Sequence, residues 1–244
     1  RFLVLAATVC SLEAADTPSQ KDADREAAAR EKWTEEIGKL TAGDASLAPD
    51  PESILFLGSS SIRLWDTIEA DMAPYKTVRR GYGGARFSDV VVFADRLIRP
   101  HRYQALVIFV GNDITGLETD PTPEQVVEWF HQVVAVSRST QPEAPVFILG
   151  VTPSRKRWEA WPQIRELNAA FETACALDPH LHFIPTSQAF IGADGRTRED
   201  YFKSDGLHLS PLGYAVWAGI IKSHLLAVLG EPALPSHFAT PPQP

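Results

Sequence analysis

The chain has 244 residues, of which 44% are hydrophobic, and it carries a formal net charge of -8. This length and apolar content suffice for one large α/β domain with a complete hydrophobic core. The acidic balance, with Lys and Arg scattered along the chain, argues against a nucleic-acid partner, because phosphate binding needs clustered basic residues.

Residues 1–15, "RFLVLAATVCSLEAA", combine a basic flank, a short apolar run and a small-residue site at Ala14 and Ala15. This pattern predicts a secretory signal peptide, and its apolar run is too short to span a bilayer. We therefore expect a secreted or periplasmic protein with no integral membrane segment after the leader is removed. Cys10 leaves anchoring as a lipoprotein as the alternative. Beyond the leader only Cys175 remains, so no intramolecular disulfide is expected, and no cluster of ligands predicts a metal.

Residues 16–230 predict a single domain that begins with an amphipathic helix at 21–40. Trp33, Ile37 and Leu40 recur in it at helical spacing, so this helix is expected to pack on the rest of the domain. Five short apolar runs of strand length follow, at residues 54–58, 76–80, 105–111, 146–151 and 181–185.

Helical patterns lie between these runs and after the last of them. A final helix is expected to be capped by Ser210 and ended by Gly230. Strand and helix thus alternate about five times, and the strands are apolar almost throughout, which is typical of a parallel sheet covered by helices on both faces. The Pro-rich residues 231–244 form a tail outside this domain. The predicted helices start near Ser88, Thr122, Trp161 and Pro211.

Polar and glycine-rich motifs follow the predicted strands, where the ligand crevice of a parallel α/β sheet lies. "GSSS" follows the first run, "GYGGA" the second and "GNDI" the third, and "SDGLH" precedes the last helix. Each motif alone has an ordinary explanation: Ser59 or Ser61 suits a helix cap, and the Gly-rich and Asn-Asp stretches suit turns.

Taken together, these motifs supply the parts that ester cleavage needs. A serine hydroxyl requires a base, and the base requires an acceptor that fixes its tautomer. His208 and Asp205, three residues apart, can fill these two roles. The tetrahedral intermediate requires hydrogen-bond donors for its oxyanion, for which the N–H of Gly84 and the amide of Asn112 are suited.

The segments "GSSS", "RRGYGGA", "VGND" and "DGLH" resemble the four blocks of the SGNH hydrolases, a subgroup of the GDSL esterases and lipases. The resemblance runs from about Ile54 to Leu226, and "PSRKRWEAWPQIRELNAAF" resembles a secreted bacterial-type branch. It implies a three-layer α/β/α sandwich of flavodoxin-like type, with five parallel strands and no cofactor.

The resemblance also implies a role for individual residues. Ser60 becomes the nucleophile, His208 the base and Asp205 its orienting partner, while the N–H groups of Ser60 and Gly84 and the amide of Asn112 form the oxyanion hole. The chain departs from the family pattern at three positions, where the family has an acidic residue, an asparagine and a glycine: these are Ser59, Arg79 and Val110.

The substrate is expected to be a short-acyl ester, acetyl above all, of a small molecule or a carbohydrate. Aromatic and basic residues in the loops after the strands are candidates to line the crevice, because Trp and Tyr stack on sugar rings. A core role is the alternative for Trp65 and Trp161. The candidates are Arg63, Trp65, Tyr82, Arg86, Arg155, Arg157, Trp158 and Trp161.

Two other functions remain open at the level of sequence. A non-catalytic glycan- or phosphate-binding module could use the same fold and the Gly-rich turn, although such a module has no need of Asp205 behind His208. A flavin or nucleotide protein is suggested by fold class alone.

Overall fold

The computed structural model describes residues 20–46 and 48–232. Its sheet has five parallel strands in the order β2-β1-β3-β4-β5, which confirms the predicted flavodoxin-like sheet. The third and fourth strands end two residues before their apolar runs do, because the chain there turns into the loops at the carboxyl edge. The strands are β1 (Ile54–Gly58), β2 (Thr77–Gly81), β3 (Ala105–Phe109), β4 (Val146–Leu149) and β5 (Leu181–Ile184).

The helices begin and end close to the predicted positions. Thr122 caps α5 by accepting a hydrogen bond from the N–H of Gln125, and Ser210 caps α8 by accepting one from Gly213. Gly230, in a left-handed conformation, ends α8. The helices are α1 (Gln20–Thr41), α2 (Ser60–Arg63), α3 (Ile68–Met72), α4 (Phe87–Ile98), α5 (Pro123–Thr140), α6 (Trp161–Ala176), α7 (Ser187–Phe190) and α8 (Pro211–Leu229), with short 3-10 turns at Asp44–Ser46, Arg155–Arg157 and Glu199–Tyr201.

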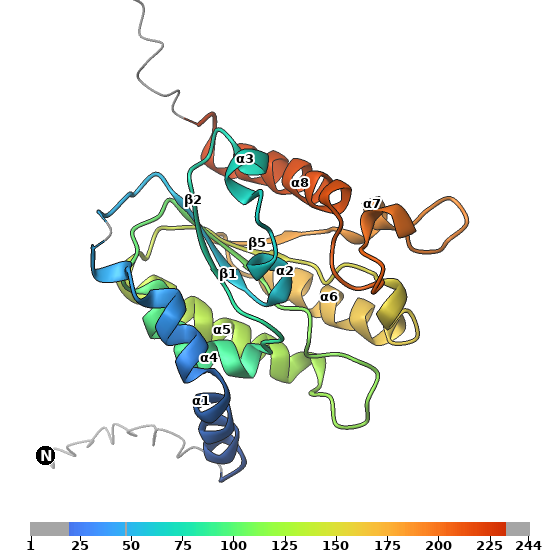
Figure 1. The fold of residues 1–244 in the computed structure, drawn as a ribbon, viewed down its shortest axis with the longest axis horizontal. Helices are drawn as coiled ribbons and strands as arrows, with labels where there is room; N and C mark the ends of the chain where they lie inside the picture. Colours follow the sequence, from blue (N-terminus) through green and yellow to red (C-terminus); the bar gives the residue numbers. More distant parts are fainter. Residues whose placement is uncertain (1–19, 47, 233–244) are drawn as a thin grey trace, which may run out of the picture.

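Helices cover both faces of the sheet and make the three layers of a sandwich (Figure 1). Side chains alternate along each strand, so Leu55 and Leu57 of β1 join the core under α4, α5 and α6. Ile54 and Phe56 point to the opposite face and join the core under α2, α3, α7 and α8. The predicted α/β/α sandwich is confirmed, and α1 packs on α4 at its outer side.

The last helix, α8, has the length and apolar composition of a membrane-spanning segment, the one helix of this kind in the described part of the chain. Its inner face belongs to the core, where Trp217, Ile221 and Leu225 are buried against the sheet. Such a core helix commonly has this composition in a protein that does not cross a membrane. The predicted signal peptide at 1–15, and the tail at 231–244 beyond its first two residues, lie outside the described residues.

Candidate active site

Ser60, His208 and Asp205 form a hydrogen-bonded line at the carboxyl edge of the sheet. Ser60 begins α2 directly after β1, and its Oγ lies 3.0 Å from Nε2 of His208. Nδ1 of the same ring lies 2.7 Å from Oδ2 of Asp205. Ser60 and His208 are 148 positions apart in the chain, whereas His208 and Asp205 lie three positions apart in one short loop.

Two glycines make this arrangement possible. A Cβ at Gly58 would lie 2.0 Å from the carbonyl oxygen of Phe109, so only glycine allows β1 to end against β3 and deliver Ser60 beside it. Gly206 has a φ of +66°, a left-handed conformation that turns the chain between Asp205 and His208. The turn folds the aspartate back so that its carboxylate faces the histidine ring.

Asp205 is held in its ionised form. Partial burial opposes ionisation, but the hydrogen bond from His208 and those from the backbone N–H groups of Leu207 and His208 lower the pKa of Asp205 to about 2. The carboxylate therefore presents a full negative charge to Nδ1 of His208 at neutral pH, which orients the ring and leaves Nε2 facing Ser60.

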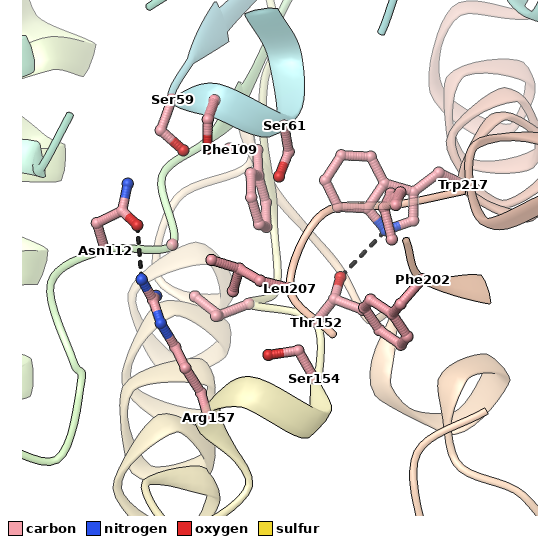
Figure 2. A pocket seen from close by; sticks show the side chains of 14 residues that line it. Ser59, Ser61, Phe109, Asn112, Thr152, Ser154, Arg157, Phe202, Leu207 and Trp217 are labelled. Carbon is pink, nitrogen blue, oxygen red and sulfur yellow. Dashed lines mark hydrogen bonds between the residues drawn. The ribbon is translucent and has the colours of Figure 1, made fainter. Parts of the chain in front are cut away.

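The three groups predicted to form an oxyanion hole each keep an uncommitted N–H hydrogen. In the described part of the chain, the N–H groups of Ser60 and Gly84 have no hydrogen-bond acceptor. The Asn112 amide nitrogen donates one hydrogen to the carbonyl of Ala85 at 2.9 Å, so its second hydrogen is uncommitted. Its oxygen accepts from the Arg157 guanidinium at 2.7 Å, which sets the direction of the amide (Figure 2).

The loop around Asn112 is anchored by the next residue. Asp113 is 1% exposed and accepts a hydrogen bond from the N–H of Phe87 at 3.0 Å, at the start of α4. Burial raises the pKa of Asp113 to about 7, although that hydrogen bond and the charge of Arg86 lower it. The loop of Asn112 and the glycine-rich loop that precedes α4 are thus tied to each other.

The helix α1 contacts the glycine-rich loop at residues 81–85, which we call the oxyanion loop after its predicted role, and the sequence pattern of α1 does not reveal these contacts. The carboxylate of Glu36 accepts a hydrogen bond from the N–H of Gly83 at 3.1 Å. Trp33 packs edge-on against Tyr82, with ring centroids 5.3 Å apart. A helix expected only to cover the domain therefore contacts two consecutive residues of the loop that presents Gly84.

A small cavity opens beside Ser60, with about 30 Å³ of space for a water-sized sphere. Asn112 and Arg157 lie on one side of it, and Trp217 donates from its indole nitrogen to Thr152 at 3.1 Å on the other (Figure 2). Thr152 could have been found as a polar residue just after β4, whereas Trp217 lies within a helix and gives no such signal. The cavity is lined by Ser59, Ser60, Ser61, Phe109, Gly111, Asn112, Val151, Thr152, Ser154, Arg157, Phe202, Leu207, Leu209 and Trp217.

Two of the predicted lining residues, Trp65 and Tyr82, do not line the cavity. Trp65 is fully buried, stacks on Tyr214 and donates its indole N–H to Asp71 at 2.7 Å, so it is part of the core under α8. Tyr82 is also fully buried, beneath Trp33. Both rings satisfy the packing demand of large aromatic side chains rather than facing solvent. Trp161, at 8% exposed, belongs to the core as well.

Of the other predicted lining residues, Arg157 does line the cavity, whereas the remaining four lie outside its walls: Arg63, Arg86, Arg155 and Trp158. Arg63 is exposed next to Gly83, and Arg155 donates to the carbonyl of Ser204 at 3.0 Å. Trp158 is half-buried and stacks on Trp161. Arg86 lines a separate groove beyond Gly84.

The departures from the family pattern have local consequences. Arg79 donates to the carbonyl of Arg63 at 2.9 Å and so ties β2 to α2 through its guanidinium. Ser59 precedes α2, but neither it nor Ser61 makes the side-chain cap expected of one of them. No group of three or more His, Cys, Asp or Glu side chains placed to hold a metal ion occurs among the residues that the structure describes.

Comparisons with known proteins identify the family of the chain. Residues 56–216 match the GDSL-like Lipase/Acylhydrolase family. The chain is 28% identical over 187 residues to platelet-activating factor acetylhydrolase IB subunit alpha1 of Homo sapiens, covering 75% of this chain and 78% of that protein.

Solved structures show the same fold at low sequence identity. A GDSL-like lipase from Bacteroides thetaiotaomicron superposes with a TM-score of 0.66 at 18% identity, over 78% of this chain and 97% of that one. A carbohydrate esterase family 3 protein from Talaromyces cellulolyticus gives 0.56 at 16% identity, over 72% and 97%. The chain therefore belongs to the GDSL-like lipase/acylhydrolase family, within the SGNH hydrolase superfamily of enzymes that act on esters.

Proposed function

We propose that the protein is a serine ester hydrolase that removes short acyl groups, acetyl above all, through an acyl-enzyme. The observation that carries this proposal is the hydrogen-bonded line from Ser60 through His208 to Asp205, together with the uncommitted N–H of Ser60 itself. A protein that only binds a ligand has no use for a carboxylate acceptor behind the histidine.

In the first step, Oγ of Ser60 attacks the ester carbonyl while Nε2 of His208 takes its proton. Asp205 stabilises the imidazolium that forms, since its carboxylate is already ionised. The carbonyl oxygen becomes negative and is bound by the N–H groups of Ser60 and Gly84 and the free hydrogen of Asn112.

The intermediate then collapses, and the C–O bond to the alcohol breaks. The imidazolium of His208 gives its proton to the departing alkoxide, so the alcohol leaves neutral and the acyl group stays on Ser60. A water molecule then attacks the acyl carbon while His208 takes its proton. The bond between the acyl carbon and Oγ of Ser60 breaks, and His208 returns the proton to Oγ. The net reaction is ester and water to carboxylic acid and alcohol.

The preference for acetyl rests on the size of the cavity beside Ser60. A single water needs ~10–15 Å³ by the same measure, so about 30 Å³ admits two or three heavy atoms without rearrangement. Phe109, Phe202 and Trp217 close its walls and would have to move for a longer chain. The name of the similar acetylhydrolase supports an acetyl ester, and the name of the similar carbohydrate esterase supports a carbohydrate ester.

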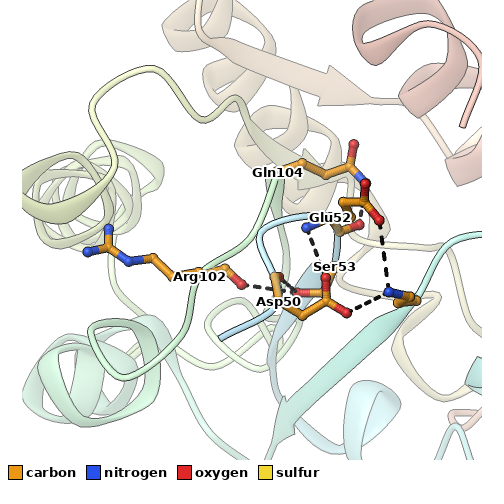
Figure 3. A network of polar contacts seen from close by, with 6 residues as sticks. Asp50, Glu52, Ser53, Arg102 and Gln104 are labelled. Atoms are coloured by element: carbon orange, nitrogen blue, oxygen red, sulfur yellow. Dashed lines mark hydrogen bonds and ion pairs between the residues drawn. The ribbon is translucent and has the colours of Figure 1, made fainter. Parts of the chain in front are cut away.

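The test compares Ser60 with a serine at the opposite edge of the sheet. Purified protein should release nitrophenol from para-nitrophenyl acetate, and Ser60→Ala should lower kcat by roughly 10³-fold or more. Ser53→Ala is the matched control: Ser53 is 2% exposed at the opposite edge of the sheet, where its hydroxyl lies 2.8 Å from the Asp50 carbonyl and 3.1 Å from that of Arg102 (Figure 3).

Ser53→Ala should leave kcat unchanged and cost about 1 kcal/mol in the free energy of unfolding, the usual net contribution of such hydrogen bonds. A fluorophosphonate should label the parent and the Ser53 variant but not Ser60→Ala. Equal turnover in the two variants, or none in the folded parent, would overturn the proposal and favour a non-catalytic glycan- or phosphate-binding module.

A further inference from the structure

A second and larger hollow, here called the α1 groove, has Gly84 in its lining. It offers about 350 Å³ to a water-sized sphere and opens to solvent. One wall is α1, which lies outside the family-matched residues 56–216. The groove is lined by Lys21, Arg25, Ala28, Ala29, Lys32, Gly84, Arg86, Ser88, Asp89, Thr119, Asp120, Pro121, Gln125 and Trp129.

Basic side chains dominate the α1 groove, although the chain as a whole is acidic. Among the described residues, Lys21, Lys32 and Arg86 have no carboxylate oxygen within ion-pair distance. Only Arg25 is paired, with Asp22 at 2.7 Å. Three of the four cations therefore have no carboxylate partner in the part of the chain that the structure describes and are available to an anionic ligand.

The two carboxylates of the α1 groove are occupied by backbone N–H groups. Oδ2 of Asp89 accepts from the N–H of Arg86 at 2.9 Å. Oδ2 of Asp120 accepts from the N–H groups of Gly116 and Leu117 at 2.8 and 3.0 Å. These hydrogen bonds fix the position of both carboxylates and keep them ionised, so the four basic side chains of the lining face two negative charges.

An aromatic surface completes the α1 groove. Trp129 is half-buried, and the guanidinium of Arg25 lies 5.0 Å from the centre of its ring. A half-buried ring with a guanidinium over it suits a sugar that also carries a negative charge, because the sugar contacts the indole while its anionic group meets Arg or Lys.

We propose that the α1 groove binds the alcohol part of the ester, and that this part is a carbohydrate bearing an anionic group, either a carboxylate or a phosphate. The inference rests on the proposed esterase function. Gly84 lines the groove, and in the proposed mechanism its N–H donates to the oxyanion, so an ester bound at Ser60 would reach the groove with its larger half. The small cavity leaves no room for that half.

The kinetic test uses three esters of matched size: acetylated glucose, acetylated glucuronate and acetylated glucose phosphate. We expect kcat/KM to be higher for one or both charged esters than for acetylated glucose, and the preferred ester identifies the anion. The double variant Lys21→Gln/Lys32→Gln should lower this preference about fivefold, the effect of two exposed ion pairs. High salt should reduce it in the parent.

The matched control is Arg165→Gln, which removes one exposed cation from α6 on another side of the molecule. It should leave the preference unchanged, which separates the groove from a general effect of net charge. Equal kcat/KM for all three esters, or a preference that Lys21→Gln/Lys32→Gln does not alter, would overturn the inference while leaving the esterase proposal standing.

Binding can be measured without turnover. Calorimetric titration of Ser60→Ala with glucuronate and with glucose phosphate should detect one of them, and the Lys21→Gln/Lys32→Gln changes in the same background should weaken that binding. If the parent has no esterase activity but glucuronate or glucose phosphate still binds in a lysine-dependent way, the proposed hydrolase function is refuted and the anion site is retained. Absence of binding by either probe would contradict the site itself.

Discussion

Arg157 fixes the amide of Asn112 and so determines how well one oxyanion donor is aimed. Its guanidinium donates to the amide oxygen at 2.7 Å, and burial lowers its pKa although Asp113 and Asp120 raise it. A charged donor on the oxygen prevents the amide from flipping and polarises its N–H groups. Arg157 is thus a positioning residue in the proposed mechanism.

Arg157→Leu should lower kcat about tenfold, the effect of one charge-assisted hydrogen bond, with KM for para-nitrophenyl acetate changed much less. Arg157→Lys, which keeps a cationic donor, should recover part of the lost kcat. Steady-state kinetics on the three proteins separates these effects. A rise in KM with unchanged kcat would mean instead that Arg157 contacts the substrate directly.

At the scale of elements, α1 extends the family fold and supports its oxyanion loop through Glu36 and Trp33. Glu36→Ala removes the acceptor of the Gly83 N–H and should lower kcat about tenfold, because a loosened loop misplaces the neighbouring N–H of Gly84. Glu36→Gln keeps an oxygen acceptor and should retain most of the activity. Equal losses in the two variants would show that the charge of Glu36, and not its hydrogen bond, is what the loop requires.

At the scale of the whole molecule, a buried polar cluster ties the segment after α1 to β2 and to the loop after α4. Asp44, Arg80 and His101 are each less than 10% exposed, and Arg80 hydrogen-bonds to both Asp44 and the His101 ring. Burial and the charge of Arg80 lower the pKa of His101 below its ordinary 6.5, although Asp44 raises it. The folded protein therefore holds this histidine neutral.

This lowered pKa makes stability depend on pH. Below about 6.5 the unfolded chain binds a proton at His101 that the folded chain refuses, so the free energy of unfolding should fall as the pH falls. His101→Gln removes this titration. Denaturant unfolding of both proteins should be measured from about pH 8 to about pH 5, a range that spans the ordinary pKa of histidine. The free energy of unfolding of the parent should fall relative to that of the variant as the pH falls. The same pH dependence in both proteins would contradict the assignment.

Local patterns in the chain determined most of the elements. Apolar runs of strand length gave five strands at nearly the predicted residues, and caps such as Thr122, Ser210 and Gly230 marked helix ends because their side-chain and backbone preferences act within one turn. Chain order and the rule for parallel sheets also predicted that the motifs of Ser60 and Asn112 would meet at one edge.

Tertiary packing decided which side chains reach the site. Trp65 and Tyr82 follow strands just as Asn112 does, yet both are buried, because the layers closing over the sheet take up the large rings. Glu36 meets Gly83 across 47 positions, and His208 meets Ser60 across 148. The elements and the chemical groups that follow them depend on near neighbours in the chain, so both could be predicted from the sequence. The contacts of α1 and the sizes of the two hollows depend on how distant layers pack, so they follow only from the tertiary structure.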